Sequence, residues 1–380
     1  MIASETADTG SIYEREMTVK IRLTALIAVL ALAAAACGSA PQTATTASSP
    51  TSAVTAGTSP GPLIEAALFG YGYDDVEVVE YVLTLDQTLS MTADGDASGF
   101  GTGDYELPVD MEATLQAEMS LRYETSPGPE PGTTTLRITS EITDLAIQGT
   151  INGEPASDAD IAELGPGDIP PIDVTVVVDE RGKVVDLQSA GEDLGALFSG
   201  LGGLENLGTA RLGRPVGPAF PEEPVGVGDT WTETTETEGP EGPIVTRATH
   251  TVVGTEMLAG REVLVVDSVY ETDGFSIDFT DFLRGFFEGL AETAGDEGSA
   301  EVGDMLDQLV FRIEVAPTTN TVTSRFDPEE GLVVTADGRD DTGLAMRFKG
   351  PNEETGEMES LDLDMTITQS LTYELVDPDA

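Results

Sequence analysis

The chain has 380 residues, with 70 acidic residues against 17 basic ones and a formal net charge of −53. This charge excludes a nucleic-acid-binding protein, because such proteins neutralise phosphates with Lys and Arg, and it disfavours adsorption to anionic lipid. The single cysteine and single histidine exclude an internal disulfide and the usual Cys/His zinc sites, so the fold must be held by its own hydrophobic core.

The N-terminal stretch reads as an export signal. Residues 1–16 contain several acids, which the basic start of a signal lacks, so we interpret them as a non-native extension before Met17. Residues 17–36 have a short basic start followed by the uncharged apolar run Leu23–Ala36, and Cys37 comes next. This pattern is typical of a secretory signal peptide, and the run is shorter than the ~20 residues that a membrane-spanning helix needs.

The residues around the cysteine indicate the kind of signal. Ala34, Ala35, Ala36 and Cys37 resemble the lipobox of bacterial lipoproteins, in which small residues precede a diacylglyceryl-modified cysteine, although Leu is more usual where Ala34 stands. The resemblance implies a mature chain that begins at Cys37 and is anchored by lipid to the cell membrane, on its extracytoplasmic face. The alternative is an ordinary signal with an unmodified cysteine.

A tether follows the cysteine. Residues 38–61 are uncharged and rich in Ala, Thr, Ser and Pro, so they cannot bury enough apolar surface to fold. A flexible chain of this length reaches roughly 25–30 Å and holds the next domain away from the membrane. Proline in the first turn then predicts a short helix over Pro62–Phe69.

The first β-rich half, residues 62–214, shows a sequence period of two. In Val109–Tyr123, apolar residues occupy every second position and polar or charged residues the others. One buried face and one solvated face are typical of an antiparallel sheet. Similar patterns predict strands at Tyr81–Met91 and at Thr133–Ile147 with a bulge near Thr143, and a hairpin of Ile172–Val178 with Lys183–Leu187.

The second β-rich half, residues 215–380, repeats this style and ends in an alternation from Leu361 to Leu375. Further strands are expected at Thr230–Glu238, Ile244–Val253, Glu262–Glu271, Val310–Val315, Thr319–Phe326, Leu332–Ala336 and Leu344–Phe348. Strands of ~15 residues are roughly 50 Å long and must twist and curl. We therefore predict a mainly β fold of the α+β class: long curved antiparallel sheets in a half-open barrel, with one or two amphipathic helices. A sandwich is the alternative.

The junction between the halves carries a motif. Residues 220–231 read Phe-Pro-Glu-Glu-Pro-Val-Gly-Val-Gly-Asp-Thr-Trp, which resembles the P-x-x-P-V-x-V-G-D-x-W signature of an uncharacterised bacterial envelope-lipoprotein family. An F-D-x-x-x-G-x-V segment over Phe326–Val333 matches the same family. The resemblance implies a lipoprotein signal before a β-rich domain and assigns no activity. We expect Trp231 to be a core anchor rather than a ligand contact.

An aromatic stripe lies between two predicted strands. Its members fall at i, i+3, i+4, i+7, i+8 and i+11, on one face of a helix; they are Phe279, Phe282, Leu283, Phe286, Phe287 and Leu290. One interpretation is a helix packed on the concave face of the sheet. The other is a cover over an apolar cavity, with these residues in contact with a hydrophobic ligand. A curved sheet with such a helix is similar to half-barrel lipoprotein carriers of acyl chains.

Three other candidate sites are weaker. Asp94, Asp96 and Ser98 resemble the start of a calcium loop, but position 12 is Tyr105 and strands flank the segment, so we interpret it as a hairpin loop without metal. The lone histidine, His250, lies in a predicted strand and has no nucleophile elbow nearby, so we interpret it as structural. Among 70 acids, no carboxylate pair stands out for glycoside hydrolysis.

Together these features predict a lipid-anchored, extracytoplasmic binding module that is not an enzyme and uses no cofactor. Its leading function is to hold a hydrophobic ligand, such as a lipid, under the Phe-rich helix, with the membrane as a partner through Cys37. One alternative is a cell-envelope structural or interaction protein without a cavity, and another is a carboxylate-based hydrolase. Because the acids are spread along the chain, they favour adaptation to salty surroundings over divalent-cation binding, and they predict a monomer.

Overall fold

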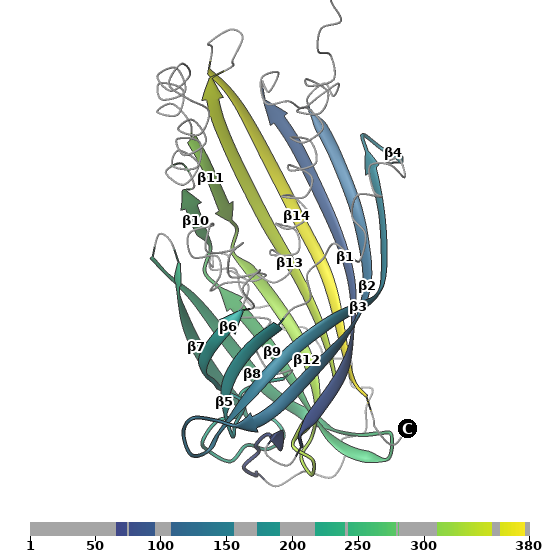
Figure 1. Cartoon of the computed structure of the whole chain (residues 1–380), viewed down its shortest axis with the longest axis vertical. Helices are drawn as coiled ribbons and strands as arrows, with labels where there is room; N and C mark the ends of the chain where they lie inside the picture. Colours follow the sequence, from purple (N-terminus) through teal and green to yellow (C-terminus); the bar gives the residue numbers. More distant parts are fainter. Residues whose placement is uncertain are drawn as a thin grey trace, which may run out of the picture.

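The computed structural model of the chain describes residues 66–73, 76–95, 108–155, 173–190, 217–239, 242–278, 280, 310–351 and 358–376. These residues form one antiparallel sheet of 14 strands that is not closed into a barrel (Figure 1). The sheet confirms the predicted fold class, a mainly β protein with long curved antiparallel strands. Within these ranges, no helix is long and apolar enough to span a membrane.

The strands vary from two residues to twenty. In chain order they are β1 (Val78–Gly95), β2 (Val109–Pro127), β3 (Thr133–Ile151), β4 (Glu154–Pro155), β5 (Asp173–Asp179), β6 (Val184–Ala190), β7 (Thr230–Gly239), β8 (Gly242–Leu258), β9 (Arg261–Thr272), β10 (Phe275–Asp278), β11 (Val310–Val315), β12 (Thr318–Asp327), β13 (Leu332–Pro351) and β14 (Met358–Leu375). Their order in the sheet is β6-β5-β3-β2-β1-β14-β13-β12-β9-β8-β7. In addition, β4 pairs with β3, and β11 pairs with both β13 and β10.

The long strands follow from the alternation in the sequence. In β1, buried Tyr81, Leu83 and Leu85 point to the inner face, while the residues between them are half-buried or exposed. In β3, Ile142 pairs with Met119 and the next pair skips Thr143, so Thr143 is the extra residue of a bulge. The bulge confirms the predicted phase slip and keeps the apolar residues beyond it on the inner face.

Two predicted elements differ from the structure. Leu332–Ala336 and Leu344–Phe348 are not separate strands but parts of the continuous β13, because β14 pairs with the charged segment between them as well. The helix predicted over Pro62–Phe69 is absent from its described part. There, Ala67 forms a bridge with Val225 through two backbone hydrogen bonds, which requires an extended chain.

The two predicted halves share one sheet, because β1 pairs with β14 along most of its length. We refer to the end with the β5–β6 and β12–β13 turns as the base, and to the end with Gly95 and Pro351 as the upper end. At the base the sheet curls, so that strands near opposite ends of the strand order contribute to one apolar cluster, the base cluster (Figure 1). Val176 of β5, Val252 of β8 and Phe326 of β12 are fully buried in it.

An N-terminal strap, residues 66–73, crosses the base. Tyr71 N donates a hydrogen bond to Glu180 O at 2.7 Å, and Gly72 N donates to Gly331 O at 2.9 Å. The strap therefore joins the β5–β6 turn to the β12–β13 turn. Gly331 has a φ of 68°, and a Cβ atom there would overlap the backbone of Gly72, so only glycine allows this close approach.

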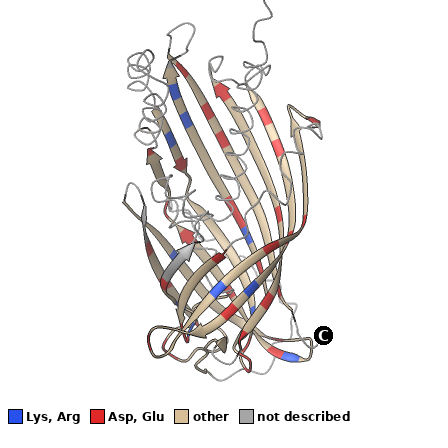
Figure 2. Cartoon of the chain, viewed as in Figure 1, with Lys and Arg blue, Asp and Glu red and all other residues tan. Residues whose placement is uncertain are grey.

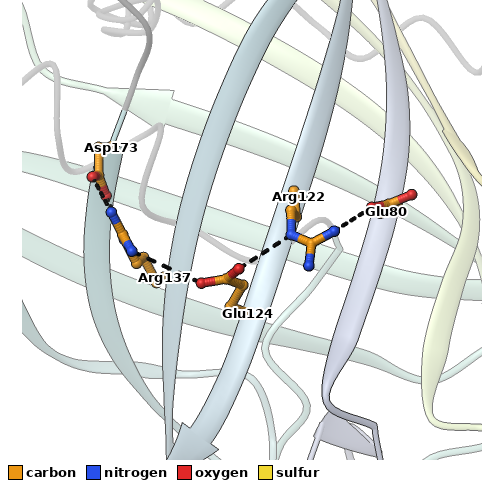
Figure 3. Close-up of polar contacts among 5 residues, drawn as sticks. All are labelled: Glu80, Arg122, Glu124, Arg137 and Asp173. Atoms are coloured by element: carbon orange, nitrogen blue, oxygen red, sulfur yellow. Dashed lines mark hydrogen bonds and ion pairs between the residues drawn. The ribbon is translucent and has the colours of Figure 1, made fainter.

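Acidic side chains lie along the strands from the base to the upper end (Figure 2). On the outer face, Glu80, Arg122, Glu124, Arg137 and Asp173 form a chain of ion pairs across β1, β2, β3 and β5, with N···O distances from 2.6 to 3.9 Å (Figure 3). The hydrogen bonds from Arg137 hold the pKa of Asp173 below its ordinary value. Exposed pairs contribute little stability each, so we interpret the chain as support for strand register.

Candidate functional site

The inner face at the upper end carries rows of apolar side chains that cross the sheet. Directly paired residues make up each row. One row runs through Met111 of β2, Met91 of β1, Met365 of β14, Leu344 of β13 and Val315 of β11. The next row towards the upper edge runs through Val109, Ala93, Leu363, Met346, Ile313 and Ile277.

Most residues of these rows belong to one apolar cluster, the upper cluster. Its buried members are Met91, Ile277, Ile313, Val315, Met346, Met365 and Ile367, and the partly buried Leu89, Met111, Phe275, Phe311, Leu344 and Leu363 pack against them. All of them come from the neighbouring strands β1, β2, β10, β11, β13 and β14, which form a single layer. Four of the chain's 10 methionines lie here. Flexible methionine side chains adapt to ligands of different shape.

A row of buried polar side chains separates the upper cluster from the base cluster. Gln87 of β1 pairs with Gln369 of β14, and Gln369 pairs with Asp340 of β13, all on the inner face. Their exposed fractions are 5 %, 2 % and 2 %. Gln369 Nε2 donates to Asp340 Oδ2 at 3.2 Å, and Thr342 Oγ1 donates to the same oxygen at 3.4 Å. Burying polar groups is costly unless they are hydrogen-bonded.

This polar row continues onto β12. Asn320 directly precedes the β12 residues that pair with β13, and Thr318 lies two residues before it on the same face. Gln87 Nε2, Asn320 Oδ1 and Thr318 Oγ1 are buried and have no hydrogen-bond partner in the part of the chain that the structure describes. A donor, an acceptor and a hydroxyl group on this row therefore remain to be satisfied.

The outer face of the same strands carries a shallow hollow of about 300 Å³. Its outward lining consists of Asp86, Thr88, Thr114, Gln116, Arg339, Thr368 and Ser370. Gln116 Nε2 donates to Asp86 Oδ1 at 2.7 Å. Gln87, Leu115 and Gln369 complete the lining. Most of the lining side chains are polar, so the hollow suits a hydroxyl-rich ligand better than a hydrophobic one.

Most predicted site residues lie outside the described residues. These are the lipidation site Cys37, the aromatic stripe from Phe279 to Leu290, and Asp96 and Ser98 of the calcium candidate. Asp94 is described: it is exposed near the end of β1, and its Oδ1 accepts a hydrogen bond from the next backbone N–H at 2.8 Å. No group of three or more His, Cys, Asp or Glu side chains in the described ranges could hold a metal ion.

His250 is fully buried at the base, beside Ser268. Its Nδ1 lies 2.8 Å from Ser268 Oγ, its ring stacks on Trp231, and the ring of Tyr270 meets it edge-on. A serine beside a histidine is the start of a nucleophilic site, but Ser268 is 1 % exposed and the His250 ring packs between the rings of Trp231 and Tyr270. The surroundings of His250 are those of a structural residue.

The junction motif lies at the base. Trp231 Nε1 donates to Ala219 O at 2.8 Å, and the Trp231 ring stacks on Phe220. Gly226 N donates to Asp229 Oδ2 at 2.8 Å, which holds the turn that leads into β7. Trp231 packs against the base cluster, as expected of a core anchor.

The F-D-x-x-x-G-x-V segment forms the β12–β13 turn. Asp327 Oδ1 accepts hydrogen bonds from Glu329 N at 2.9 Å and Glu330 N at 3.2 Å, and Gly331 N donates to Asp327 O at 2.8 Å. Phe326 and Val333, on either side of the turn, are fully buried. Both motif segments therefore build the base and not the upper end.

Four tyrosines are buried at the base: Tyr71, Tyr73, Tyr81 and Tyr123. Burial raises the pKa of each of these phenols well above its ordinary value. Tyr71 OH donates to Pro218 O at 2.9 Å. The hydroxyls of Tyr73 and Tyr81 have no hydrogen-bond partner among the described residues, so these two side chains contribute mainly by packing.

The polar row is not among the sites predicted from the sequence. Gln87 and Gln369 occupy inward positions in strands whose inward positions are otherwise apolar, and this interruption is the signal that identifies them. Asp340 gives no such signal, because the segment from Asp337 to Gly343 is charged and contains two glycines, which is typical of a turn. Only its pairing with β14 shows that Asp340 faces inward.

No protein-family model and no curated protein matches the chain. Among solved structures, lipovitellin, described for its lipid–protein interactions, is similar with a TM-score of 0.28 and 12 % identity. The match covers 78 % of this chain and 25 % of lipovitellin, so the chain spans about a quarter of that protein. The β domain of the Bordetella autotransporter BrkA has a TM-score of 0.15 and 6 % identity, over 77 % and 99 % of the two chains. Pseudomonas aeruginosa OpdK with vanillate has a TM-score of 0.16 and 9 % identity, over 77 % and 98 %. Similarities this low carry no argument about function.

Proposed function

We propose that the protein is a non-catalytic, extracytoplasmic module that holds a hydrophobic ligand against the upper cluster. The observation that carries the proposal is an apolar inner surface made by one layer of strands, with no strand of the opposite flank against it in the described chain. At the base, by contrast, strands from both flanks share one cluster. An acyl chain that packed against this surface would lose its contact with water, which favours binding.

The aromatic stripe is the proposed second wall of this site. β10 ends at Asp278 and β11 begins at Val310, and Asp278 pairs with Arg312. The chain between these strands therefore leaves and rejoins the sheet beside the upper cluster, which contains Ile277 and Ile313. This connectivity supports a ligand held between the upper cluster and the stripe of Phe279, Phe282, Leu283, Phe286, Phe287 and Leu290.

The anchor belongs to the same proposal. Lipid on Cys37 would keep the module at the cell membrane, where hydrophobic ligands are available, as in the envelope-lipoprotein family that the junction motif resembles. We expect Cys37→Ala to move the protein from the membrane fraction to the soluble fraction, and metabolic labelling with an acyl chain to be lost. A Cys37→Ala protein that stays in the membrane fraction would contradict the anchor.

The ligand is tested by native mass spectrometry of the full chain purified from its cells in mild detergent. We expect a co-purifying apolar molecule, which solvent extraction removes and added palmitoyl lipid replaces. Leu363→Gln changes a half-buried residue of the upper cluster and should lower the bound fraction. Thr366→Gln changes an exposed residue of the same strand and should leave the bound fraction unchanged. If no apolar molecule binds before or after extraction, the carrier function is wrong.

The outer hollow favours a second candidate function, an interaction with a cell-wall polymer. Its Thr and Ser hydroxyls and the Gln116 amide are suited to hydroxyl-rich chains rather than to lipid. Sedimentation of the protein with purified cell walls tests this candidate. Loss of binding in Thr114→Val and Thr368→Val, with lipid binding unchanged, would support it.

A further inference from the structure

We infer that the ligand is an uncharged amphiphile whose head has two or more hydroxyl groups, with the head on the polar row and the acyl chain on the upper cluster. This inference rests on the proposed function and specifies its ligand class. Under this inference the preferred ligand is a lipid with hydroxyl groups, and not a fatty acid or a hydrocarbon, although both of these could also bind to an apolar surface.

The polar row borders the upper cluster directly. Gln87 lies two residues from Leu89 on β1, and Gln369 lies two residues from Ile367 on β14. Side chains two apart on a strand share a face and are separated by roughly 7 Å. A molecule with its chain on Leu89 and Ile367 therefore places its polar end within reach of the two glutamines.

The unsatisfied groups on the row require both donors and acceptors. Gln87 Nε2 needs an acceptor, Asn320 Oδ1 needs a donor, and Thr318 Oγ1 can use either. A hydroxyl group donates and accepts, so hydroxyls satisfy all three. Gln87 on β1 and Asn320 on β12 are three strand positions apart, roughly 14 Å, so a glycerol head serves the Gln87 end of the row, and a larger polyol head is needed to reach Asn320 as well.

The acid on the row disfavours an anionic head. Asp340 lies between the glutamine pair and Asn320, is 2 % exposed, and already accepts hydrogen bonds from Gln369 and Thr342. A fatty-acid carboxylate placed here would lie against a second carboxyl group, and two such groups cannot both stay ionised at close range away from water. A hydrocarbon would leave the buried polar groups unsatisfied. An uncharged polyol head avoids both costs.

The test compares three probes that share one chain: 1-palmitoylglycerol, palmitate and hexadecane. Each is added to the delipidated full chain at pH 7.5, and binding is measured by native mass spectrometry and by displacement of a fluorescent lipid. We expect 1-palmitoylglycerol to bind at least about tenfold more tightly than palmitate or hexadecane, the factor expected from about one net hydrogen bond.

Variants of the polar row should change this preference in different ways. Gln87→Met with Gln369→Met keeps similar side-chain volume and should bring 1-palmitoylglycerol to within about threefold of hexadecane, because the head loses its partners. Asp340→Asn removes the charge and should raise the affinity for palmitate. Thr372→Val, on the outer face of β14 and outside the hollow, is the matched control and should change nothing.

The outcomes distinguish this inference from the proposed function. If all three probes bind equally and the row variants have no effect, ordered water satisfies the row, and the inference is overturned while the carrier function stands. Tighter binding of palmitate than of 1-palmitoylglycerol also overturns the inference. If none of the probes binds, both the inference and the proposed function are overturned.

Discussion

The base and the upper end share several of the longest strands but bury their inner faces in different ways. At the base, the sheet curls so that β5 and β8, near opposite ends of the strand order, contribute to one cluster. At the upper end, the apolar rows belong to neighbouring strands of a single layer. The row of Gln87, Gln369 and Asp340 divides the two regions.

The base also contains most of the specific contacts that hold the described chain in a single conformation. The strap, the two hydrogen-bonded turns, the junction motif and the stacked aromatic rings all lie there. The described upper end has flexible methionines instead and a polar boundary with unsatisfied groups. We therefore expect the base to provide most of the folding stability, and we propose that the upper end is the region that binds the ligand.

The largest effect should come from matched truncations of one aromatic residue in each region. Phe326→Ala removes a fully buried ring that contacts Tyr71 and Phe220, and should cost about 3–5 kcal/mol of unfolding free energy. Phe348→Ala removes a half-buried ring at the upper end and should cost less than about 2 kcal/mol. Urea denaturation measures both. Equal losses of unfolding free energy in the two variants would contradict the idea that the base provides most of the folding stability.

Glycine substitutions test the close packing of the strap. Gly331→Ala places a Cβ atom against the backbone of Gly72 at a φ of 68°, and should cost about 1–3 kcal/mol. Gly254→Ala is the control, because a Cβ atom there meets nothing within 4 Å and the backbone is not left-handed. It should be neutral or stabilise by up to about 1 kcal/mol. Thermal unfolding of the two variants gives the comparison. An equally stable Gly331→Ala protein would show that the strap does not fix the turn.

The buried tyrosines make the base sensitive to alkali. Burial raises the pKa of Tyr81 above the unfolded value of about 10, so the folded state retains a proton that the unfolded state loses. The contribution of the protonated, buried Tyr81 to the unfolding free energy is fully present below about pH 10. Above it, each such tyrosine lowers the unfolding free energy by about 1.4 kcal/mol per pH unit, until the pH reaches the folded pKa.

Replacing one of these tyrosines checks the sign and the size of this effect. Tyr81→Phe should be near neutral at pH 7, because its hydroxyl has no partner among the described residues, and should reduce the slope above pH 10. Urea midpoints from pH 8 to pH 11.5 measure the slope. Tyrosinate absorbance should rise only as the protein unfolds. A variant with the wild-type slope would contradict the assignment to Tyr81.

The smallest effect concerns the outer ion pairs. Arg137→Gln removes the hydrogen bonds that hold the pKa of Asp173 below its ordinary value, so that pKa should rise, as measured by NMR titration. The contribution of this ion pair to the unfolding free energy is present above the pKa that Asp173 has in the unfolded chain. It is lost as the pH falls through the pKa of Asp173 in the folded protein. Because the pair is exposed, the urea midpoint should hardly change. A large change in the urea midpoint would show that the outer ion pairs contribute more to folding stability than we expect.

The sequence predicts the fold well and the candidate site poorly. Strict alternation in Val109–Tyr123 and Leu361–Leu375 identifies long antiparallel strands, and even the bulge at Thr143 leaves a visible phase change. Local patterns cannot show which strands end up opposite each other. The contrast between a two-sided base and a one-layer upper end depends on strand order and curling, which are set by contacts far apart in the chain.

The polar row shows the same limit at the level of single residues. Gln87 and Gln369 interrupt an apolar pattern, but nothing in the sequence says that they pair with each other or that Asp340 joins them. Asp340 lies in a segment with strong turn character, and only pairing with β14 overrides that local preference. Buried polar groups are thus predicted worst where tertiary contacts decide the structure.

Hydrogen-exchange mass spectrometry with and without 1-palmitoylglycerol shows which end of the sheet binds the ligand. We expect slower exchange at the upper end, in residues 89–95, 109–113, 344–350 and 361–367, and no change at the base, in residues 136–140, 174–178 and 263–266. Protection spread evenly over both regions, or confined to the base, would contradict the claim that the upper end is the binding region.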